Sequence, residues 1–218
     1  MHVLLLRHGQ TDDNARGVLQ GHTPTRLNAL GRRQAEALAA RLASYSPPVE
    51  ALVSSDLPRA AETAEIIARA LNLPVETTEV WRERAFGPFE GRAIGEAYLW
   101  REATGSWDLP GAEPTEAFRA RIRSALLDVV ERFQGRKAVA VVSHGAAINT
   151  VLRLLAEGDV PLGEGEMPPD LSPIDNCAIV DLRVERSDGT VVWRVTRLND
   201  TSHLATEVEA FTLERQPR

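Results

Sequence analysis

The sequence lacks several features that would indicate a particular cellular setting. Its 218 residues include a single cysteine, Cys177, which excludes an intrachain disulfide and fits a reducing compartment. No apolar run approaches the roughly 18 residues of a membrane span. The apolar stretch near the N-terminus is too short for a secretory signal. We therefore expect a cytoplasmic protein with no membrane partner.

The chain also lacks an excess of positive charge. The chain carries 25 Lys and Arg against 31 Asp and Glu, a formal net charge of -6. A chain of that sign is a poor general binder of nucleic acid, so no such partner is expected. Hydrophobic residues make up 43% and can fill a core, and internal repeats are absent. The length suits one large α/β domain over residues 1–218 better than two small ones.

Apolar periodicity predicts the fold class. Short apolar runs at 3–6, 51–53 and 138–142 are typical of strands buried on both faces. Apolar stripes with helical period lie between and after them, at 35–42, 60–71, 118–133 and 147–155. This alternation predicts an α/β fold, a three-layer α/β/α sandwich with a mostly parallel sheet.

The C-terminal part has a different pattern. Residues 178–197 alternate apolar and polar side chains around Asp188-Gly189, which predicts an antiparallel hairpin at the sheet edge. A second copy could pair with that edge, so a homodimer stays open. Residues 84–113, rich in Gly, Trp and Pro, could form a lid over a site. Residues 157–175 are expected to be a surface loop.

Two His-Gly pairs follow apolar strands. Arg7-His8-Gly9 ends the first predicted strand and Ser143-His144-Gly145 ends the third. In open α/β sheets ligands bind beyond the carboxyl ends of the strands. The second strand leads into Asp56-Leu57-Pro58-Arg59, which places Arg59 at the positive N-terminal end of the next helix. We expect these side chains to converge at one sheet edge.

This set of side chains suits phosphoryl transfer. Arginine forks match phosphate oxygens. A neutral imidazole, with a free pKa of roughly 6.5, is a good nucleophile at neutral pH. His8 would accept the phosphoryl group, within a few ångströms of Arg59 and His144 and open to solvent. Arg7, Arg59 and a protonated His144 would each meet one equatorial oxygen. The leaving oxygen also needs a proton from a carboxylic acid that these motifs do not identify.

Two other site classes compete with this interpretation. Two histidines and a carboxylate can bind zinc, although neighbouring arginines would repel the cation. Ser54, Ser55 or Ser143 beside a histidine could indicate a serine hydrolase, but the sequence has no G-x-S-x-G motif. We expect neither a metal nor a cofactor.

Five motifs in order resemble those of the histidine phosphatase superfamily, which includes the phosphoglycerate mutases. They begin with Leu6-Arg7-His8-Gly9-Gln10-Thr11 and continue through the segment 21–35. The later ones are Ser54–Ala60 with Thr63-Ala64, Glu83–Gly87 with Glu90-Gly91, and Ser143-His144-Gly145, before a similar close at 198–204. The resemblance covers nearly the whole chain.

The resemblance implies a role for each matching residue. His8 would be the phosphorylated nucleophile, and Glu83 would be the proton donor and later the base for water. Phosphate would be held by these residues: Arg7, Asn14, Gln20, Arg59, Glu83, His144 and Gly145. Glu62, Glu90 and Glu113 are interpreted as surface or capping carboxylates, and His22 and His203 as structural.

The same phosphohistidine could serve a phosphatase or a mutase. Mutases of this family have a longer, more basic insertion after the acid motif, whereas residues 92–110 contain only Arg92 and Arg101 as bases. Phe86 also stands where mutases usually have a tyrosine. We therefore expect a phosphatase of small phosphorylated metabolites. The alternatives are a cofactor-dependent phosphoglycerate mutase and a non-catalytic phosphate-binding module.

Overall fold

A six-stranded sheet forms the centre of the molecule. The computed structural model describes residues 1–163, 173–187 and 190–204. The strands are β1 (His2–Arg7), β2 (Val49–Ser55), β3 (Val75–Thr78), β4 (Ala138–Ser143), β5 (Ile179–Ser187) and β6 (Thr190–Asp200), in the order β3-β2-β4-β1-β5-β6. The β1–β4, β4–β2 and β2–β3 pairs are parallel, whereas β5 is antiparallel to β1 and β6. The predicted mostly parallel sheet with an antiparallel hairpin at its edge is confirmed.

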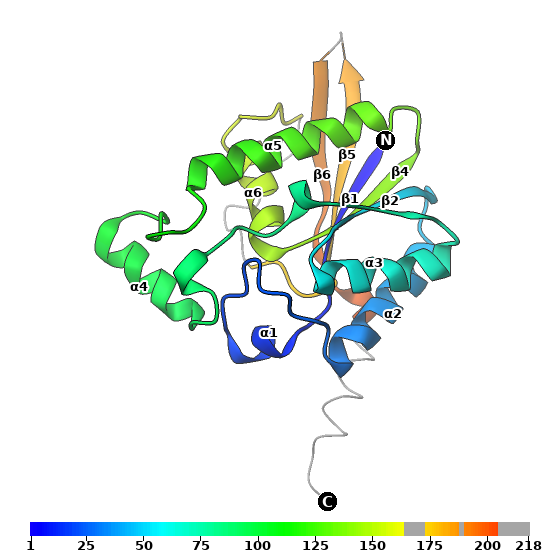
Figure 1. The fold of residues 1–218 in the computed structure, drawn as a ribbon. Helices are drawn as coiled ribbons and strands as arrows, with labels where there is room; N and C mark the ends of the chain where they lie inside the picture. The colour runs from blue at the N-terminus through cyan, green and yellow to red at the C-terminus, as the bar shows by residue number, and fades with distance from the viewer. Residues whose placement is uncertain (164–172, 188–189, 205–218) are drawn as a thin grey trace, which may run out of the picture.

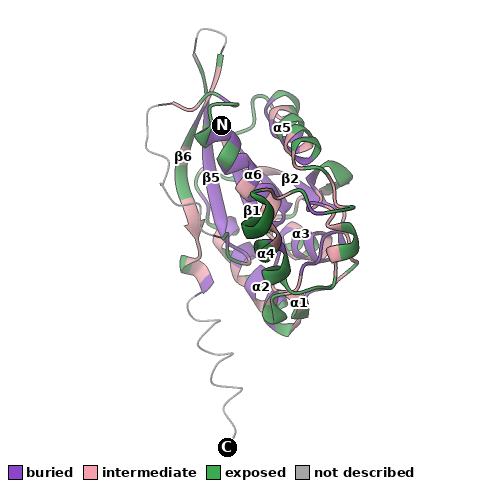
Figure 2. Ribbon diagram, turned by 90° about the vertical axis from the view of Figure 1, so that its left-hand side faces the viewer, coloured by how far each residue is buried: buried purple, intermediate pink, exposed green. Residues whose placement is uncertain are grey.

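Helices cover both faces of this sheet (Figure 1). Leu4 and Leu6 of β1 pack in one apolar cluster with α2 (Ala29–Ala43) and α3 (Pro58–Leu71). Val3 and Leu5 pack in another with α5 (Thr115–Arg132) and α6 (Gly145–Ala156). Successive side chains of a strand point to opposite faces, so strands apolar throughout support two helical layers. Figure 2 shows the buried strands between the helices, which confirms the three-layer prediction.

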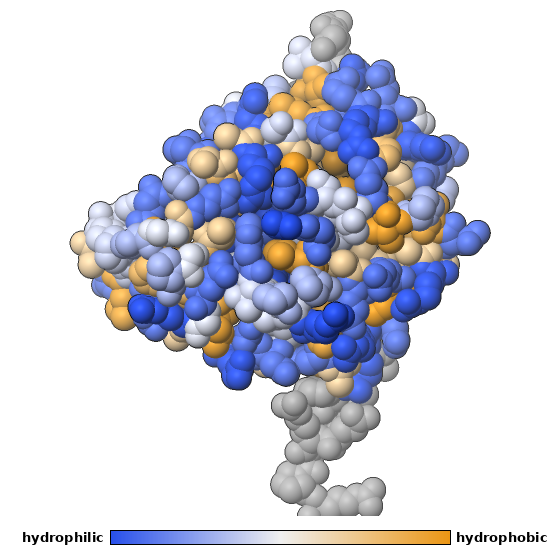
Figure 3. Space-filling model, in the orientation of Figure 1, coloured by the Kyte–Doolittle hydropathy of each residue, from blue (hydrophilic) through white to orange (hydrophobic). Residues whose placement is uncertain are grey.

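Neither β3 nor α4 (Ile94–Thr104) was predicted. β3 is a short edge strand with no buried residue, so its sequence carries no clear period. α4 buries only Ala97 and leaves Ile94, Tyr98 and Leu99 exposed, so an apolar stripe of the expected kind is missing. Apolar side chains consequently reach the surface around α4 (Figure 3). The remaining short helices are α1 (Asp12–Arg16), η1 (Glu79–Trp81), η2 (Gly87–Phe89) and η3 (Ser202–Leu204).

The segment 84–113 has a small apolar cluster of its own. Its buried members are Leu19, Ala97 and Leu109, and five partly buried residues pack on them: Phe86, Phe89, Trp100, Trp107 and Ala112. Backbone bonds join it to residues 17–19, from Leu19 N–H to the Arg92 carbonyl at 2.9 Å and from Gly91 N–H to the Leu19 carbonyl at 2.8 Å. The segment is therefore fastened mainly to the loop after α1, and Figure 1 shows α4 at the side of the molecule.

The remaining predictions concern residues at the β6 edge. Asp188-Gly189 and residues 164–172 lie outside the described residues. Of the predicted surface loop, residues 161–163 pair with β6, from Trp193 N–H to the Pro161 carbonyl at 3.0 Å and from Gly163 N–H to the Trp193 carbonyl at 2.7 Å. The chain itself thus occupies part of the edge considered for a homodimer. None of the described helices is long and apolar enough to cross a membrane.

Candidate active site

The strand order brings the two His-Gly motifs together. β4 lies between β1 and β2, with Arg7 opposite Ser143 in one register and Ser54 opposite Val142 in the other. The His8 N–H donates to the Ser143 carbonyl at 3.0 Å, just beyond the paired strands. The imidazole rings of His8 and His144 lie 5.1 Å apart between centroids. The expected convergence at one sheet edge is therefore observed.

His8 has one ring nitrogen prepared for attack. Its Nδ1 lies 2.7 Å from the Gly9 carbonyl, an acceptor, so Nδ1 carries the hydrogen and Nε2 carries the lone pair. Burial, and then the charges of Arg59 and Arg7, lower the pKa of His8 well below 6.5. The imidazole is therefore neutral at pH 7. Our expectation of an imidazole open to solvent was wrong, because His8 is only 2% exposed.

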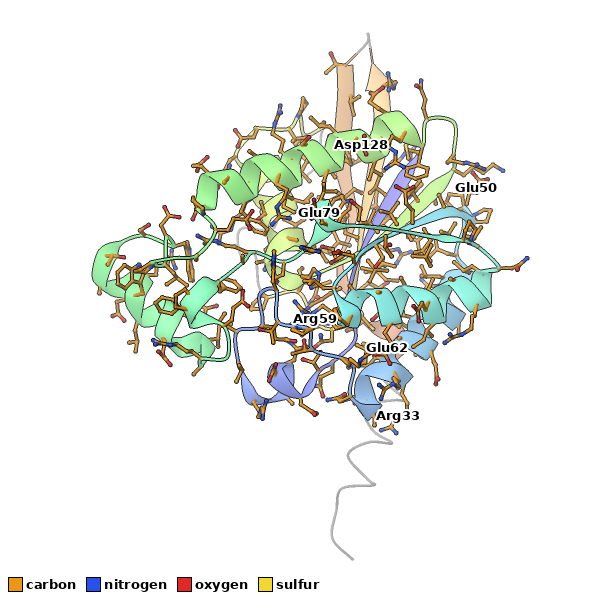
Figure 4. All side chains as sticks on the ribbon, in the orientation of Figure 1. Arg33, Glu50, Arg59, Glu62, Glu79 and Asp128 are labelled. Carbon is orange, nitrogen blue, oxygen red and sulfur yellow. The ribbon has the colours of Figure 1, made fainter. Side chains whose placement is uncertain are left out.

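Arg59 covers the nucleophilic nitrogen. Its Nε–H donates to His8 Nε2 at 3.2 Å, and its Nη2 donates to the Gly21 carbonyl at 2.8 Å. Nη1 donates to the Thr23 carbonyl at 3.1 Å. Burial lowers the pKa of Arg59 to about 10, which leaves it charged at neutral pH. Figure 4 shows this side chain at the start of α3, beside the loop after α1. Arg59 thus links the nucleophile to residues 21–25.

Arg7 is the second cation of the site, and its side chain is half-buried. Its Nη1 donates to the Ile174 carbonyl at 2.5 Å, while its Nε is buried without a partner among the described residues. Burial lowers its pKa, an effect that the Glu83 charge opposes. Gly145, the first residue of α6, lies against this guanidinium, and a Cβ there would stand 3.6 Å from Nε. An unpaired buried donor at this edge is suited to an anion.

His144 lies deeper than His8, with no exposed surface. Its Nε2 is 2.8 Å from the Ser55 hydroxyl, whereas Nδ1 is buried without a partner in the described chain. Burial, together with the Arg59 charge, lowers the pKa of His144 well below 6.5. His144 is therefore neutral in the free site, because a buried imidazole beside arginines disfavours a further positive charge, and its protonation against a bound phosphoryl group stays a prediction.

Glu83 lies just beyond η1, where the site meets solvent. Its Oε2 accepts the Ala146 N–H at 3.0 Å, at the N-terminus of α6, and its Oε1 accepts the Arg84 N–H at 3.0 Å. The carboxylate is half-buried and its charge acts on both Arg7 and Arg59. Glu83, which only the family resemblance identified as the acid, therefore lies beside the cationic residues.

Two side chains hold the backbone that carries Glu83. Arg121 of α5 donates to the carbonyls of Val80 at 2.9 Å and Arg82 at 3.0 Å, and it forms an ion pair with Glu113. His22 Nε2 donates to the Glu83 carbonyl at 2.9 Å. Arg121 was not predicted from the sequence. Its position beside the apolar stripe of a long helix could have indicated a cation that bonds a neighbouring segment. The structural interpretation of His22 agrees with this contact.

Asn14 and Gln20 are engaged in the loop rather than left unpaired. Asn14 lies in α1, where its side chain accepts from the Thr11 N–H at 3.1 Å and from Asn176 Nδ2 at 3.2 Å. Gln20 is buried, and its Oε1 accepts from the hydroxyls of Thr11 at 2.9 Å and Thr25 at 2.6 Å. Both residues shape the loop next to His8, and their contact with phosphate stays a prediction.

A polar residue of α3 also supports the nucleophile. Thr63 accepts the Gly9 N–H at 3.1 Å and donates to the Arg59 carbonyl at 2.8 Å. It occupies a fully buried position on an apolar helix face, which was the signal available in the sequence.

In the part of the chain that the structure describes, no group of three or more His, Cys, Asp or Glu side chains is placed to hold a metal ion.

The family match agrees with this geometry. Residues 3–201 match the model of the histidine phosphatase superfamily, branch 1. The chain belongs to the histidine phosphatase superfamily. The predicted enzyme class, a phosphatase of this family, is confirmed by that match together with the phosphatase relatives.

Relatives of this histidine phosphatase include proteins with two kinds of name. An uncharacterized phosphatase, PhoE, of Bacillus subtilis (strain 168) is 31% identical, covering 93% of this chain and 96% of the relative. A probable phosphoglycerate mutase, GpmB, of Yersinia enterocolitica is 32% identical, covering 94% and 95%. The solved structure of a mycobacterial glucosyl-3-phosphoglycerate phosphatase with VO3 has a TM-score of 0.74 and 27% identity, covering 92% of this chain and 99% of that one.

Proposed function

We propose that this histidine phosphatase hydrolyses the phosphomonoester of a small metabolite through a phosphohistidine on His8. The observation that carries the proposal is the neutral His8, whose Nε2 lone pair accepts from Arg59 Nε at 3.2 Å, beside two buried nitrogens that have no partner among the described residues. Those nitrogens, Arg7 Nε and His144 Nδ1, are suited to the oxygens of a phosphoryl group. Phosphatase names among the relatives support the hydrolytic outcome.

The first half-reaction transfers the phosphoryl group to the enzyme. In the free site the Arg59 Nε–H donates to His8 Nε2. When substrate binds, this N–H donates to the phosphate instead, so the lone pair on His8 Nε2 becomes available for attack. Nε2 then forms a bond to phosphorus as the ester P–O bond breaks. Glu83 acts in this step as the carboxylic acid, having first taken a proton from solvent, and it passes that proton to the leaving oxygen. Arg7, Arg59 and His144 stabilise the charge on the three equatorial oxygens.

The second half-reaction returns the enzyme to its free form. Glu83, now a carboxylate, takes a proton from a water molecule as that water attacks phosphorus. The P–N bond breaks, and inorganic phosphate and neutral His8 result. A half-buried carboxylate at the solvent side of the buried histidines suits both steps, because it reaches the leaving group and then the incoming water.

The cations of segment 84–113 favour hydrolysis over mutase chemistry. Arg84 donates to the Glu113 carbonyl at 2.8 Å and the Trp107 carbonyl at 3.0 Å, and Arg92 pairs with Glu96 at 3.2 Å. Arg101 lies over the Trp107 ring, 4.9 Å from its centroid. These contacts are internal to the segment, whereas a mutase needs cations for a second anionic group. The mutase remains the second candidate because of its named relatives.

A substrate screen tests the proposal. Purified protein would be incubated with p-nitrophenyl phosphate and a panel of phosphorylated metabolites, with His8→Ala as the control. We expect phosphate release that is lost in the variant. Isomerisation of 3-phosphoglycerate that depends on 2,3-bisphosphoglycerate would instead establish the mutase. Phosphate binding with neither activity would establish a non-catalytic module.

A further inference from the structure

Ser55 lies next to His144 in the interior of the site. It is the last residue of β2, and the sheet order β2-β4-β1 places Ser55, His144 and His8 on three neighbouring strand ends. The Ser55 hydroxyl lies 2.8 Å from His144 Nε2, and neither residue has exposed surface. Water therefore does not compete for this hydrogen bond.

The direction of that hydrogen bond follows from the other contacts of Ser55. Its oxygen accepts the Leu57 N–H at 3.3 Å. Among the described residues, His144 Nε2 is the acceptor within reach of the hydroxyl hydrogen. If Nε2 carried a hydrogen instead, the buried Ser55 O–H would lack an acceptor, which is costly. The hydroxyl therefore donates to Nε2.

The direction of this bond determines the tautomer of His144. When Nε2 accepts, the hydrogen of a neutral imidazole lies on Nδ1. Nδ1 is the buried nitrogen without a partner in the described chain. An Nδ1–H group offers a donor to an anion, whereas the other tautomer would present a lone pair that repels phosphate oxygens.

We propose that Ser55 is a positioning residue, which fixes His144 as the Nδ1–H tautomer so that the neutral ring donates to the transferring phosphoryl group. This role rests on the proposed function of the site. It explains how a histidine that is neutral in the free enzyme can stabilise phosphate without first gaining a proton. Arg7 and Arg59 then supply the positive charge, and His144 supplies an oriented donor.

A serine nucleophile is a poorer interpretation of the same pair. The residues around Ser55 do not form the G-x-S-x-G motif that exposes a nucleophilic serine. A serine hydrolase also needs a third group that orients the histidine. Within the described residues, His144 Nδ1 has no carboxylate partner.

Nuclear magnetic resonance of the ring nitrogens tests the tautomer directly. Protein labelled with ¹⁵N-histidine has five histidines, and the His144 signals would be assigned by their loss in His144→Gln. We expect the Nδ1–H pattern in the wild type and a mixture of tautomers in Ser55→Ala. An Nε2–H pattern in the wild type would overturn the inference, and this measurement needs no turnover.

Kinetics with matched variants provide the second arm. Ser55→Ala should lower kcat for p-nitrophenyl phosphate about tenfold with KM little changed, less than the roughly hundredfold loss typical of removing a donor outright. Ser54→Ala is the control, because Ser54 is equally buried and its hydroxyl donates to the Ser55 carbonyl at 2.8 Å instead of to His144. Ser55→Thr, which retains the hydroxyl, should restore most of the rate.

The two arms separate this inference from the proposed function. Equal rates for Ser55→Ala and Ser54→Ala would overturn the role of Ser55 even if the enzyme is a phosphatase. A wild-type protein with the Nδ1–H pattern but no hydrolysis would instead leave the tautomer assignment supported and remove the proposed function.

Discussion

The two sides of the candidate site are built in different ways. On one side, the histidines and Arg59 sit on strand ends and a helix start inside the main core, each at most 2% exposed. On the other side, segment 84–113 packs around Leu19, Ala97 and Leu109 and exposes the apolar side chains of α4. The comparison suggests a rigid scaffold for phosphoryl transfer and a separately packed segment next to it, which suits selection of the leaving group.

Breaking the rigid side at its nucleophile should have the largest effect. His8→Ala removes the only nitrogen that the proposed chemistry can phosphorylate, so kcat/KM should fall roughly 10⁴-fold or more. Phosphate release from p-nitrophenyl phosphate measures this loss. His2→Ala is a matched control on the same strand, since His2 lies at the opposite end of β1 and contacts Asp181. Comparable losses in both variants would contradict the assignment of His8.

The second largest effect should come from acidic pH, which should lower the free energy of unfolding through His8 and His144. Burial holds the pKa values of His8 and His144 well below 6.5, whereas both titrate near roughly 6.5 in the unfolded chain. Below about pH 6.5 the unfolded state therefore binds more protons than the folded state. The free energy of unfolding has its highest value above that pH and falls as the pH drops further. Each histidine contributes up to about 1.4 kcal/mol per pH unit until the folded pKa is reached.

Urea unfolding at pH 7 and pH 5.5 measures this dependence. Burial also lowers the pKa of His203, so this residue adds to the change of unfolding free energy with pH. That contribution should be the same in the wild type and in a variant at His8. His8→Asn should reduce the dependence on pH, because a side chain without a titratable nitrogen removes one of the contributions. An unchanged slope in His8→Asn would mean that His8 is not held neutral in the folded protein.

Much of this architecture was predictable because it depends on local pattern. Apolar periodicity was sufficient for the layers, and strand ends followed by Arg7-His8 and Ser143-His144 were sufficient for the histidine pair. Glu83 was not predictable from the residues alone, since its place depends on how Arg121 and His22 hold the loop after η1. The neutrality of His144 and the burial of His8 also depend on the packed surroundings, which no motif encodes.

A pair of glycine variants compares backbone packing in the two regions. A Cβ on Gly31 of α2 would lie 2.1 Å from the Gln10 carbonyl oxygen, and one on Gly9 would lie 2.3 Å from the Gly31 carbonyl oxygen. Gly31→Ala must therefore displace the backbone next to His8, at a cost of roughly 1–3 kcal/mol. In α4, a Cβ on Gly95 would meet nothing within 4 Å.

Gly95→Ala should accordingly stabilise the fold by about 0.4–1 kcal/mol, through reduced freedom of the unfolded chain. Thermal unfolding of both variants checks the two signs, and p-nitrophenyl phosphate hydrolysis should fall only for Gly31→Ala. Destabilisation by both substitutions would show that α4 is packed as tightly as the nucleophile loop, which would remove the contrast between the regions.

Loosening segment 84–113 should have the smallest effect on chemistry. Arg84 is 6% exposed and ties the segment together through the carbonyls of Glu113 and Trp107 and the carboxylate of Asp108. Arg84→Ala should lower hydrogen-exchange protection by about 1 kcal/mol or more across 94–113 while that of β4 and α6 is unchanged. Hydrolysis of p-nitrophenyl phosphate should be nearly unaffected, because Glu83 uses the backbone N–H of residue 84 rather than its side chain.

The control for this variant is Arg101→Ala in the same segment. Arg101 contributes a ring contact with Trp107, worth roughly 0.5–1 kcal/mol at an exposed position, so protection should change less than in Arg84→Ala. If Arg84→Ala also lowers protection in β4 and α6, the two sides unfold as one unit. Substitutions in segment 84–113 that change substrate selection would then also move His8. A backbone displacement in the segment would reach the strand ends through Leu19 and residues 21–25.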